Sequence, residues 1–428
     1  MKLNNWLSLL PLLIFFPSFG QTIDTLKLTS QTLVMDEEKL DGMLCSIDSY
    51  QHELVVGIPW EDNGRLGLDT NNVATGAAII YNIDEKGELQ QLQHLRADDG
   101  QPFDRFGESV AISEKYLAIG APGKVGNSII SVGNGPGAVY LYEKKNEHWE
   151  SIQKLTFPDT SVHLRFGGEV ALYGDFLLTS VFLPTSTEGI STIEGVVVLF
   201  KRNANGVWSL TQQVSVPPIF KRTIFGKDIV VDNGQVMIST HPAILLDHEE
   251  KPDLSGGVLY YQLDTIQGAL QYIHHLSSDH SSSRKKGYFG QAMALKRGEL
   301  LILESSERAI YKYSYSIDTG WDLERKFQVP QKQMSIRKTN QLVFGEHHII
   351  AGNSRLLQGT TLYMLRAQGD ENYSWEVDNL QKLPAEDDWY ILIHDMKIID
   401  NYLIVVQEDR TSMNSSESYN WLRVYSLE

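Results

Sequence analysis

Apolar and polar residues alternate in short runs along almost the whole chain. A stretch at residues 105–157 shows the pattern clearly: it reads RFGESVAISEKYLAIGAPG, then a Gly-rich loop, then GAVYLYEKKNEHWESIQKLTF. Alternation with a period of two is typical of half-buried β-strands, and no window of similar length shows the helical period. The pattern therefore predicts an all-β protein built from short antiparallel strands.

The same plan of four runs recurs along the chain. Phe-Gly pairs open four of the units, about 60 residues apart, at Phe106-Gly107, Phe166-Gly167, Phe225-Gly226 and Phe289-Gly290. Each pair is followed by a strand-like run, a short polar turn and a second apolar run. A loop of variable length then leads to two further runs, the last of which often begins with Trp. Four antiparallel strands in a repeated unit are typical of a β-propeller blade, in which the Gly of each pair would permit close backbone approach.

Three further units lack the Phe-Gly pair, one at the beginning of the chain and two at its end. The last unit has no fourth run, whereas residues 24–29 read DTLKLT, similar to IQKLTF at residues 152–157. A strand borrowed from the N-terminus would complete the last unit and leave no open seam between the first and last blades. We therefore predict a seven-bladed β-propeller of four-stranded antiparallel blades, closed by an N-terminal strand in the last blade. Six blades with an additional edge element are the alternative.

The second unit resembles the FG-GAP repeat. The residues that carry this resemblance are Phe106-Gly107, Gly120-Ala121-Pro122, Gly137-Ala138-Val139-Tyr140, Trp149 and Lys154-Leu155. Other units match partly, and the last two are degenerate, so the resemblance extends over nearly all of residues 24–428. This repeat forms the propeller at the N-terminus of integrin α subunits and occurs in many bacterial secreted proteins. The resemblance implies the fold and says little about function.

Some FG-GAP blades, including those of integrins, carry a calcium loop of the D-x-D-x-D-G type between their first two strands. The equivalent connections here, among them SEK, YGD and DNG, lack the alternating acidic residues that a calcium ion requires. We therefore expect a chain of the short-turn bacterial variety, with no calcium loop, no other metal site and no cofactor.

The first 20 residues combine one Lys, an apolar stretch and a small-x-small ending at Ser18-Phe19-Gly20. This pattern predicts a signal peptide at residues 1–20, followed by a single propeller domain at residues 21–428, with an uncleaved anchor as the alternative. The only cysteine, Cys45, can form no intramolecular disulfide. We expect an exported monomer from a bacterium, periplasmic, on the cell surface or secreted. The net charge of −17 disfavours nucleic acid as a partner, and no later segment is apolar enough to span a membrane.

The connections between the second and third runs are long in the first four units, at residues 59–75, 122–136, 182–194 and 242–255. Equivalent loops of a propeller emerge on one face, and long loops on a rigid scaffold commonly bind ligands. An exposed Trp beside carboxylates suits a sugar, and the fourth loop adds an acidic cluster with one His. The candidate ligand-binding residues are Trp60, Glu61, Asp62, Asp69, Asp247, His248 and Glu249. Solvated acidic loops without a ligand are the alternative.

No known catalytic motif is present, neither a Gly-x-Ser-x-Gly elbow nor a His-Glu-x-x-His helix nor a phosphate-binding loop. We therefore predict no catalytic residues and an exported, non-enzymatic binding protein that presents its long-loop face to a protein or glycan partner. The alternative is a secreted hydrolase or lyase that acts on polysaccharide. Such an enzyme requires His, Tyr or acidic side chains that converge at the centre of the ring.

Overall fold

The computed structural model describes most of the chain from Lys27 to Leu427. The described ranges are 27–37, 46–61, 74–123, 136–158, 165–187, 190–217, 223–242, 256–278, 288–304, 307–329, 340–345, 348–355, 359–367, 373–379, 390–410 and 418–427. Within these ranges all regular secondary structure is β-strand, so none of it is a helix long and apolar enough to cross a membrane.

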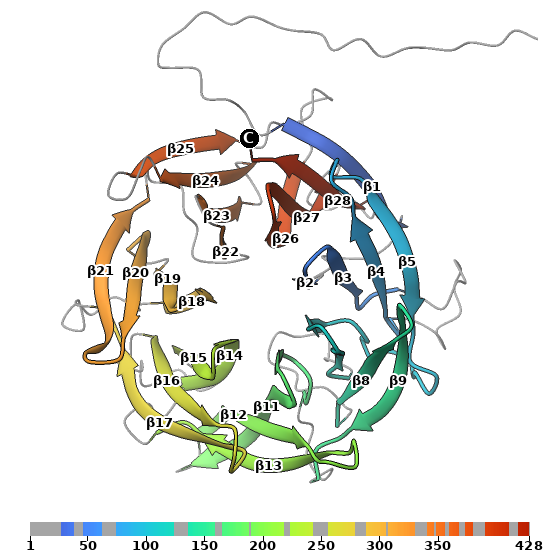
Figure 1. The fold of residues 1–428 in the computed structure, drawn as a ribbon, viewed down its shortest axis with the longest axis vertical. Coiled ribbons are helices and arrows are strands. Elements are labelled where there is room, and N and C mark those ends of the chain that lie inside the picture. The colour runs from blue at the N-terminus through green and yellow to red at the C-terminus, as the bar shows by residue number, and fades with distance from the viewer. Residues whose placement is uncertain are drawn as a thin grey trace, which may run out of the picture.

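The strands form seven four-stranded antiparallel sheets, which are arranged as blades around one axis (Figure 1). From the axis outward, blade 1 contains β2 (Ile47–Tyr50), β3 (Glu53–Ile58), β4 (Ala77–Ile83) and β5 (Leu89–Leu95). Blade 2 contains β6 (Ser109–Ile112), β7 (Tyr116–Ala121), β8 (Ala138–Lys145) and β9 (His148–Leu155). Blade 3 contains β10 (Val170–Tyr173), β11 (Phe176–Thr187), β12 (Ile190–Arg202) and β13 (Trp208–Ser215). Blade 4 contains β14 (Thr223–Asp232), β15 (Gln235–Pro242), β16 (Gly257–Asp264) and β17 (Ala269–Leu276).

The remaining blades follow the same order. Blade 5 contains β18 (Phe289–Lys296), β19 (Glu299–Glu304), β20 (Ala309–Ser316) and β21 (Gly320–Gln328). Blade 6 contains β22 (Asn340–Phe344), β23 (His348–Arg355), β24 (Gly359–Ala367) and β25 (Tyr373–Asn379). Blade 7 contains β26 (Tyr390–Ile399), β27 (Tyr402–Arg410), β28 (Ser418–Ser426) and β1 (Lys27–Glu37). The predicted all-β, seven-bladed propeller is confirmed, and the alternative of six blades is excluded.

The ring is closed by the N-terminal strand, as predicted. Strand β1 pairs antiparallel with β28 along the full length of β28, from Lys27 opposite Ser426 to Glu37 opposite Ser418. The closing strand is longer than the predicted segment at residues 24–29, which it overlaps only at residues 27–29. Its length follows from its partner, because every second residue of β28 points its backbone N–H and C=O toward β1 along the whole strand.

The Phe-Gly pairs bring neighbouring blades into close backbone contact. Gly107 and Gly167 both have positive φ, at 93° and 88°. A Cβ atom on Gly107 would lie 2.2 Å from the carbonyl oxygen of Ala77 in the preceding blade, and one on Gly167 would lie 2.4 Å from that of Ala138. Only glycine combines this conformation with this contact, so the predicted close backbone approach is confirmed for these two pairs, whereas at Gly226 and Gly290 the nearest atom is a side-chain methyl of Val197 or Val258. The four Phe rings of the pairs are fully buried between the blades.

The outer edges of blades 1 to 4 are joined by glutamines. One glutamine near the middle of each outermost strand donates its amide N–H to a backbone carbonyl of the next blade and accepts the N–H of the same residue. These outer clasps are Gln93 with Trp149 (2.8 and 3.0 Å), Gln153 with Trp208 (2.8 and 2.9 Å) and Gln212 with Leu270 (3.2 and 2.6 Å). Each side-chain amide therefore uses both its donor and its acceptor on a single residue.

The two sides of the ring differ in their connections. In each blade the first strand runs away from one side and the second strand returns to it. The connections after the second strands therefore lie on the side where the first strands begin, which we call the loop face. The opposite side carries the short turns between the first and second strands, and we call it the turn face.

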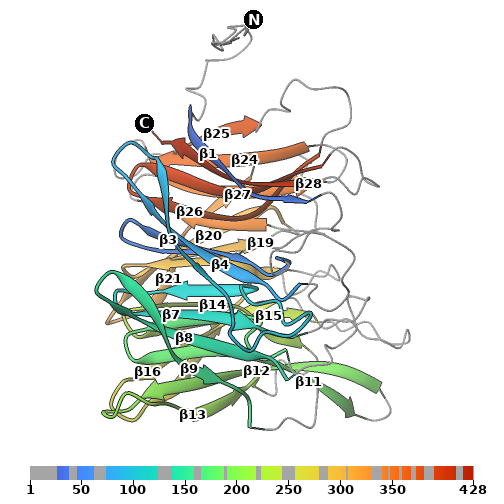
Figure 2. The ribbon, with the colours of Figure 1, turned by 90° about the vertical axis from the view of Figure 1, so that its right-hand side faces the viewer.

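The connection predicted as a long loop at residues 182–194 is mostly strand. Strands β11 and β12 pair from Phe176 opposite Lys201 to Thr187 opposite Ile190, and their hairpin projects beyond the neighbouring blades (Figure 2). The segment reads FLPTSTEGISTIE, and its β-branched Thr and Ile residues favour an extended backbone. Most of the other three predicted loops lies outside the described residues.

Candidate functional site at the ring axis

The innermost strands place one residue from each blade at the same level, near the loop face. Each of these residues lies four positions before its blade's short turn, so that Ser109 is opposite Gly120, Ala292 opposite Leu303 and Asp395 opposite Val406. We call this set the axial level. Its members are Ser46, Ser109, Glu169, Asp228, Ala292, Gln341 and Asp395. Six of the seven are polar, in strands whose other residues are mostly apolar.

The level below it is mostly apolar. Because side chains alternate along a strand, residues two positions further on share the same face. These residues are Asp48, Ala111, Ala171, Val230, Ala294, Val343 and Lys397. Only Asp48 and Lys397 are charged, and they lie in the adjacent blades 1 and 7. The Nζ atom of Lys397 is 2.9 Å from Oδ1 of Asp48, and the two side chains are 35% and 24% exposed.

Three of the carboxylates join neighbouring blades at their inner edges. In each case one oxygen accepts a hydrogen bond from a backbone N–H on the first strand of the next blade. These inner clasps are Asp395 Oδ2 with Ile47 N (2.9 Å), Asp48 Oδ2 with Ile112 N (2.9 Å) and Asp228 Oδ2 with Met293 N (2.8 Å). The aspartates therefore have a structural role, which also fixes their position at the axis.

The charged groups interact across the axis. Burial is the main cause of the raised pKa values of Glu169 in blade 3 and Asp228 in blade 4, and the charge of Asp395 in blade 7 adds to both. Since blades 3 and 4 are not neighbours of blade 7, this interaction runs across the centre of the ring (Figure 1). Together with the ion pair below them, these residues form one group that we call the axial cluster: Asp48, Glu169, Asp228, Asp395 and Lys397.

Burial shifts the protonation of this cluster. It raises the pKa of Asp228 to about 7 and that of Asp395 to about 6, although the nearby Lys397 opposes both shifts. Burial, followed by the charge of Asp228, raises the pKa of Glu169 well above its usual range. Burial lowers the pKa of Lys397, but the charges of Asp48 and Asp395 outweigh it and hold the pKa above its ordinary value. At neutral pH the axis thus combines carboxylic acids with ionised carboxylates and an ammonium group.

Glu169 differs from the aspartates of the cluster. Within the described part of the chain, no hydrogen bond is made by its carboxyl group, whereas its backbone carbonyl accepts from Ser180 N at 3.1 Å. A protonated carboxyl group can donate one hydrogen bond and accept others. Glu169 is therefore the member of the cluster that is best able to bind a ligand without loosening the ring.

The predicted site residues Trp60 and Glu61 take part in contacts within the protein. Trp60 is half-buried and packs against the core between blades 1 and 7, and the Arg105 guanidinium lies 4.7 Å from the centre of its ring. Glu61 accepts hydrogen bonds from His94 Nε2 (2.9 Å) and Arg96 Nε (3.0 Å). Burial raises the pKa of Glu61, but these two partners outweigh it and lower the pKa below its usual value.

The other predicted site residues lie outside the described residues: Asp62, Asp69, Asp247, His248 and Glu249. Their ligand-binding role stays a prediction, as does that of Trp60 and Glu61. Among the residues that the structure does describe, no group of three or more His, Cys, Asp or Glu side chains is placed to hold a metal ion.

The sequence contained a signal for the axial cluster that the prediction missed. The runs EVALY and DIVVD begin with the carboxylates Glu169 and Asp228, whereas the equivalent runs of blades 2 and 5 begin with Ser109 and Ala292. Aligning the blades on their short turns shows that this position is variable and mostly polar. Recurring residues build the scaffold, so a position that varies within a regular repeat is the place to look for a site.

Comparison with known proteins supports the fold. Residues 89–142 match the FG-GAP repeat family, and this segment runs from β5 into β8. No curated protein sequence matches the chain significantly.

Two solved structures resemble the fold with TM-scores above 0.5. The polysaccharide lyase Uly1 is 12% identical with a TM-score of 0.53, and the match covers 94% of this chain and 100% of that one. A proposed 6-phosphogluconolactonase from Bacteroides fragilis is 8% identical with a TM-score of 0.51, covering 84% of this chain and 90% of that one. At such low identities the likeness concerns the fold alone. The chain is thus a seven-bladed β-propeller protein that carries an FG-GAP repeat.

Proposed function

We propose that the protein is an exported, non-enzymatic binding module that holds a glycan on its loop face, with one sugar unit at the axial cluster. The observation that carries this proposal is the set of carboxyl groups with raised pKa values that interact across the ring axis. Strongly shifted pKa values in a confined group of side chains are more common at functional sites than elsewhere.

The chemistry of the cluster favours a polyhydroxylated ligand. Sugar hydroxyls both donate and accept hydrogen bonds, and so does a carboxyl group that keeps its proton. At the same level, the Ser109 hydroxyl donates to Gly167 O and the Gln341 amide donates to His394 O, both at 2.8 Å, so these two side chains are partly committed to contacts within the protein. A strongly anionic ligand is disfavoured, because the four carboxyl groups of the cluster outnumber the ammonium groups of Lys397 and Lys227 that act on them.

The arrangement favours binding over catalysis. Asp48, Asp228 and Asp395 each hold a backbone N–H of the next blade, so these carboxylates are fixed in one orientation. Fixed groups bind with little loss of side-chain entropy. Glu169 supplies the adaptable contact.

One observation favours a second candidate, an enzyme that cleaves polysaccharide by hydrolysis or elimination. A general acid must keep its proton at the working pH, and a nearby base must lack one. Asp228, with its pKa at about 7, and Glu169, with its raised pKa, suit the first role, whereas the less shifted Asp395 suits the second. The likeness to a polysaccharide lyase adds no weight beyond the fold.

A glycan array with purified residues 21–428, read for both binding and released product, tests the two candidates. We expect binding without product, and weaker binding in Glu169→Ala. Glu150→Gln is the matched control, since Glu150 is an exposed carboxylate that pairs with Lys145 on the outer part of blade 2. Product that is released by the wild type and lost in Glu169→Gln would replace binding with catalysis as the function. If neither binding nor released product is detected, the proposal of a glycan partner is contradicted and the search turns to protein partners.

A further inference from the structure

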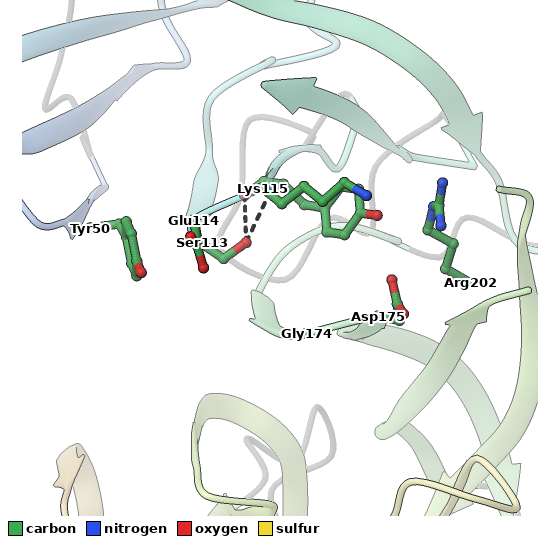
Figure 3. Close-up of a pocket in the computed structure, with 8 residues that line it drawn as sticks. Tyr50, Ser113, Glu114, Lys115, Gly174, Asp175 and Arg202 are labelled. Atoms are coloured by element: carbon green, nitrogen blue, oxygen red, sulfur yellow. Dashed lines mark hydrogen bonds between the residues drawn. The ribbon is translucent and has the colours of Figure 1, made fainter. Parts of the chain in front are cut away.

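A pocket lies on the turn face, where blades 1, 2 and 3 meet (Figure 3). It has a volume of about 400 Å³ and is formed mainly by the short turns between first and second strands. Its lining residues are Tyr50, Ser113, Glu114, Lys115, Tyr116, Gly174, Asp175 and Arg202. None of them belongs to the axial cluster or to the residues predicted from the sequence.

Two cations of this pocket share the same neighbours. Lys115 Nζ and the Arg202 guanidinium carbon lie 5.2 and 5.4 Å from the centre of the Tyr116 ring. Both also face one carboxylate, Glu143, from which their nearest nitrogens are 3.3 and 3.9 Å distant. The second distance is too long for a hydrogen bond, so Glu143 holds Lys115 closely and Arg202 only loosely.

Arg202 has hydrogen-bonding capacity to spare. Its Nε atom is buried and has no hydrogen-bond partner, and its side chain is 22% exposed. A guanidinium group presents its donors as a rigid fork that matches the two oxygens of a carboxylate. The nearest ion-pair partner of Arg202, Glu143, is 3.9 Å away, so a carboxylate that enters this pocket can form a closer, charge-assisted contact with Arg202.

The remaining polar groups of the pocket limit the choice of ligand. Glu114 lies on one side of the pocket, and Asp175 lies beside Arg202 on the other (Figure 3). Both can accept hydrogen bonds from hydroxyl groups, whereas they would repel a dianion such as phosphate. The Ser113 hydroxyl is already committed, because it donates to Tyr116 O (2.9 Å) and accepts from Tyr116 N (3.0 Å).

We propose that this pocket binds a hydroxylated carboxylate, of which a sugar acid is the simplest form. The carboxylate pairs with Arg202 and Lys115, and the hydroxyls donate to Asp175 and Glu114. The volume suits a small ligand of this size, since such sites commonly range from about 300 to 1,000 Å³. The site lies on the turn face and stands independently of the glycan proposed for the loop face.

Isothermal titration of residues 21–428 with D-glucuronate and with D-glucose tests the site. We expect glucuronate to bind and glucose, which lacks the carboxylate, to leave no signal. Arg202→Gln should weaken glucuronate binding at least about tenfold, because it removes a charge-assisted fork. Lys115→Met gives a second variant, in which the loss of a 55% exposed side chain leaves the packing intact. Lys145→Met, an exposed lysine in the same blade, is the control.

Two results would overturn the proposal: no glucuronate binding by the wild type, or equal affinity in the wild type and in both pocket variants. A titration with an acidic oligosaccharide separates the two sources of the ligand. Tighter binding of the oligosaccharide than of free glucuronate identifies a unit of an acidic polysaccharide. Equal or weaker binding identifies a free sugar acid.

Discussion

Hydrogen bonds from a side chain to the backbone join neighbouring blades at both their inner and their outer edges, but the side chains differ between the two edges. At the outer edge a neutral amide, such as that of Gln153, gives and receives one hydrogen bond with Trp208 of the next blade. At the inner edge a carboxylate, such as that of Asp228, accepts one hydrogen bond from Met293. Both side chains reach from one blade to the backbone of the next.

The two kinds of clasp differ in their charge and therefore in their dependence on pH. An amide has no charge to desolvate, and its outer clasp is independent of pH. At the axis, burial raises the pKa of a carboxyl group. Such a group also keeps a second oxygen and an exchangeable proton. If joining blades were the only requirement, amides would serve better at both edges. The titratable groups at the inner edge are therefore consistent with the binding role proposed for the axial cluster.

Removing the cation of the inner edge should have the largest effect on stability. Lys397→Met leaves Asp48 and Asp395 without their compensating charge, and we expect the free energy of unfolding at pH 7 to fall by about 2–3 kcal/mol. This is less than for a fully buried pair, because the Lys397 side chain is 35% exposed. Urea denaturation measures the loss.

The exposed Lys145, which pairs with Glu150, provides the control: Lys145→Met should change the free energy of unfolding by no more than about 0.5 kcal/mol. An equal effect of both substitutions would mean that the axial charges are solvated like surface ones. Such a result would contradict the proposed difference between the charged inner clasps and the neutral outer clasps.

Breaking one outer clasp should have the next largest effect, and the loss should not depend on pH. Gln153→Ala removes both hydrogen bonds with Trp208, each worth about 1 kcal/mol, so we expect a loss of about 2 kcal/mol. Denaturation at pH 5 and at pH 8 should give the same difference from the wild type. A loss that varies with pH would show that the outer edge is coupled to titrating groups.

Converting an inner clasp to an amide should have the smallest effect, and its sign should depend on pH. Asp228→Asn keeps the acceptor for Met293 N but removes the titrating group. We expect the variant to be more stable than the wild type by about 1 kcal/mol at pH 8, a value reduced by solvent screening, and to show a much smaller gain at pH 4. Melting temperatures across this range measure the change.

The direction in which stability changes with pH follows from the number of protons that the folded and unfolded states bind. The unfolded chain releases the Asp228 proton near 3.8, whereas the folded protein holds it until about pH 7. Between these values the folded state binds more protons, so its stability falls as pH rises and the full penalty is present above pH 7. The variant lacks this penalty. A gain in the opposite order, larger at pH 4 than at pH 8, would show that the pKa of Asp228 is not raised. Asp175→Asn, at an exposed carboxylate, serves as the control.

The fold could be predicted because its determinants are local and repeated. The Phe-Gly pairs, the alternating runs and the short turns each lie within a few residues of one another, and they recur in blade after blade. The error at residues 182–194 has a local cause as well. The segment separates the second and third apolar runs and is therefore expected as a connection, although β-branched residues on both sides of Gly189 also suit a hairpin.

The candidate site could not be predicted in the same way, since closure of the ring creates it. Glu169, Asp228 and Asp395 come from three blades that are far apart in the sequence, and only an alignment of the blades on their short turns places them at one equivalent position. The contacts of Trp60 are a similar case. The sequence marks an aromatic residue beside carboxylates, but Arg105, which lies against its ring, follows only after the whole of blade 1.

The pairing of β1 with β28 determines the order in which the blades of the ring can fold. The strand synthesised first among those described is the last to find its partner, because that partner is the final strand of the chain. Six blades consist of neighbouring hairpins that can form as soon as their residues emerge, whereas the seventh must close a loop of nearly the entire chain. Until then β1 has no partner, and the outer edge of β28 is open. The seam thus delays completion of the seventh blade until strands from both ends of the described chain are available, and β1 then forms the outer edge of that blade.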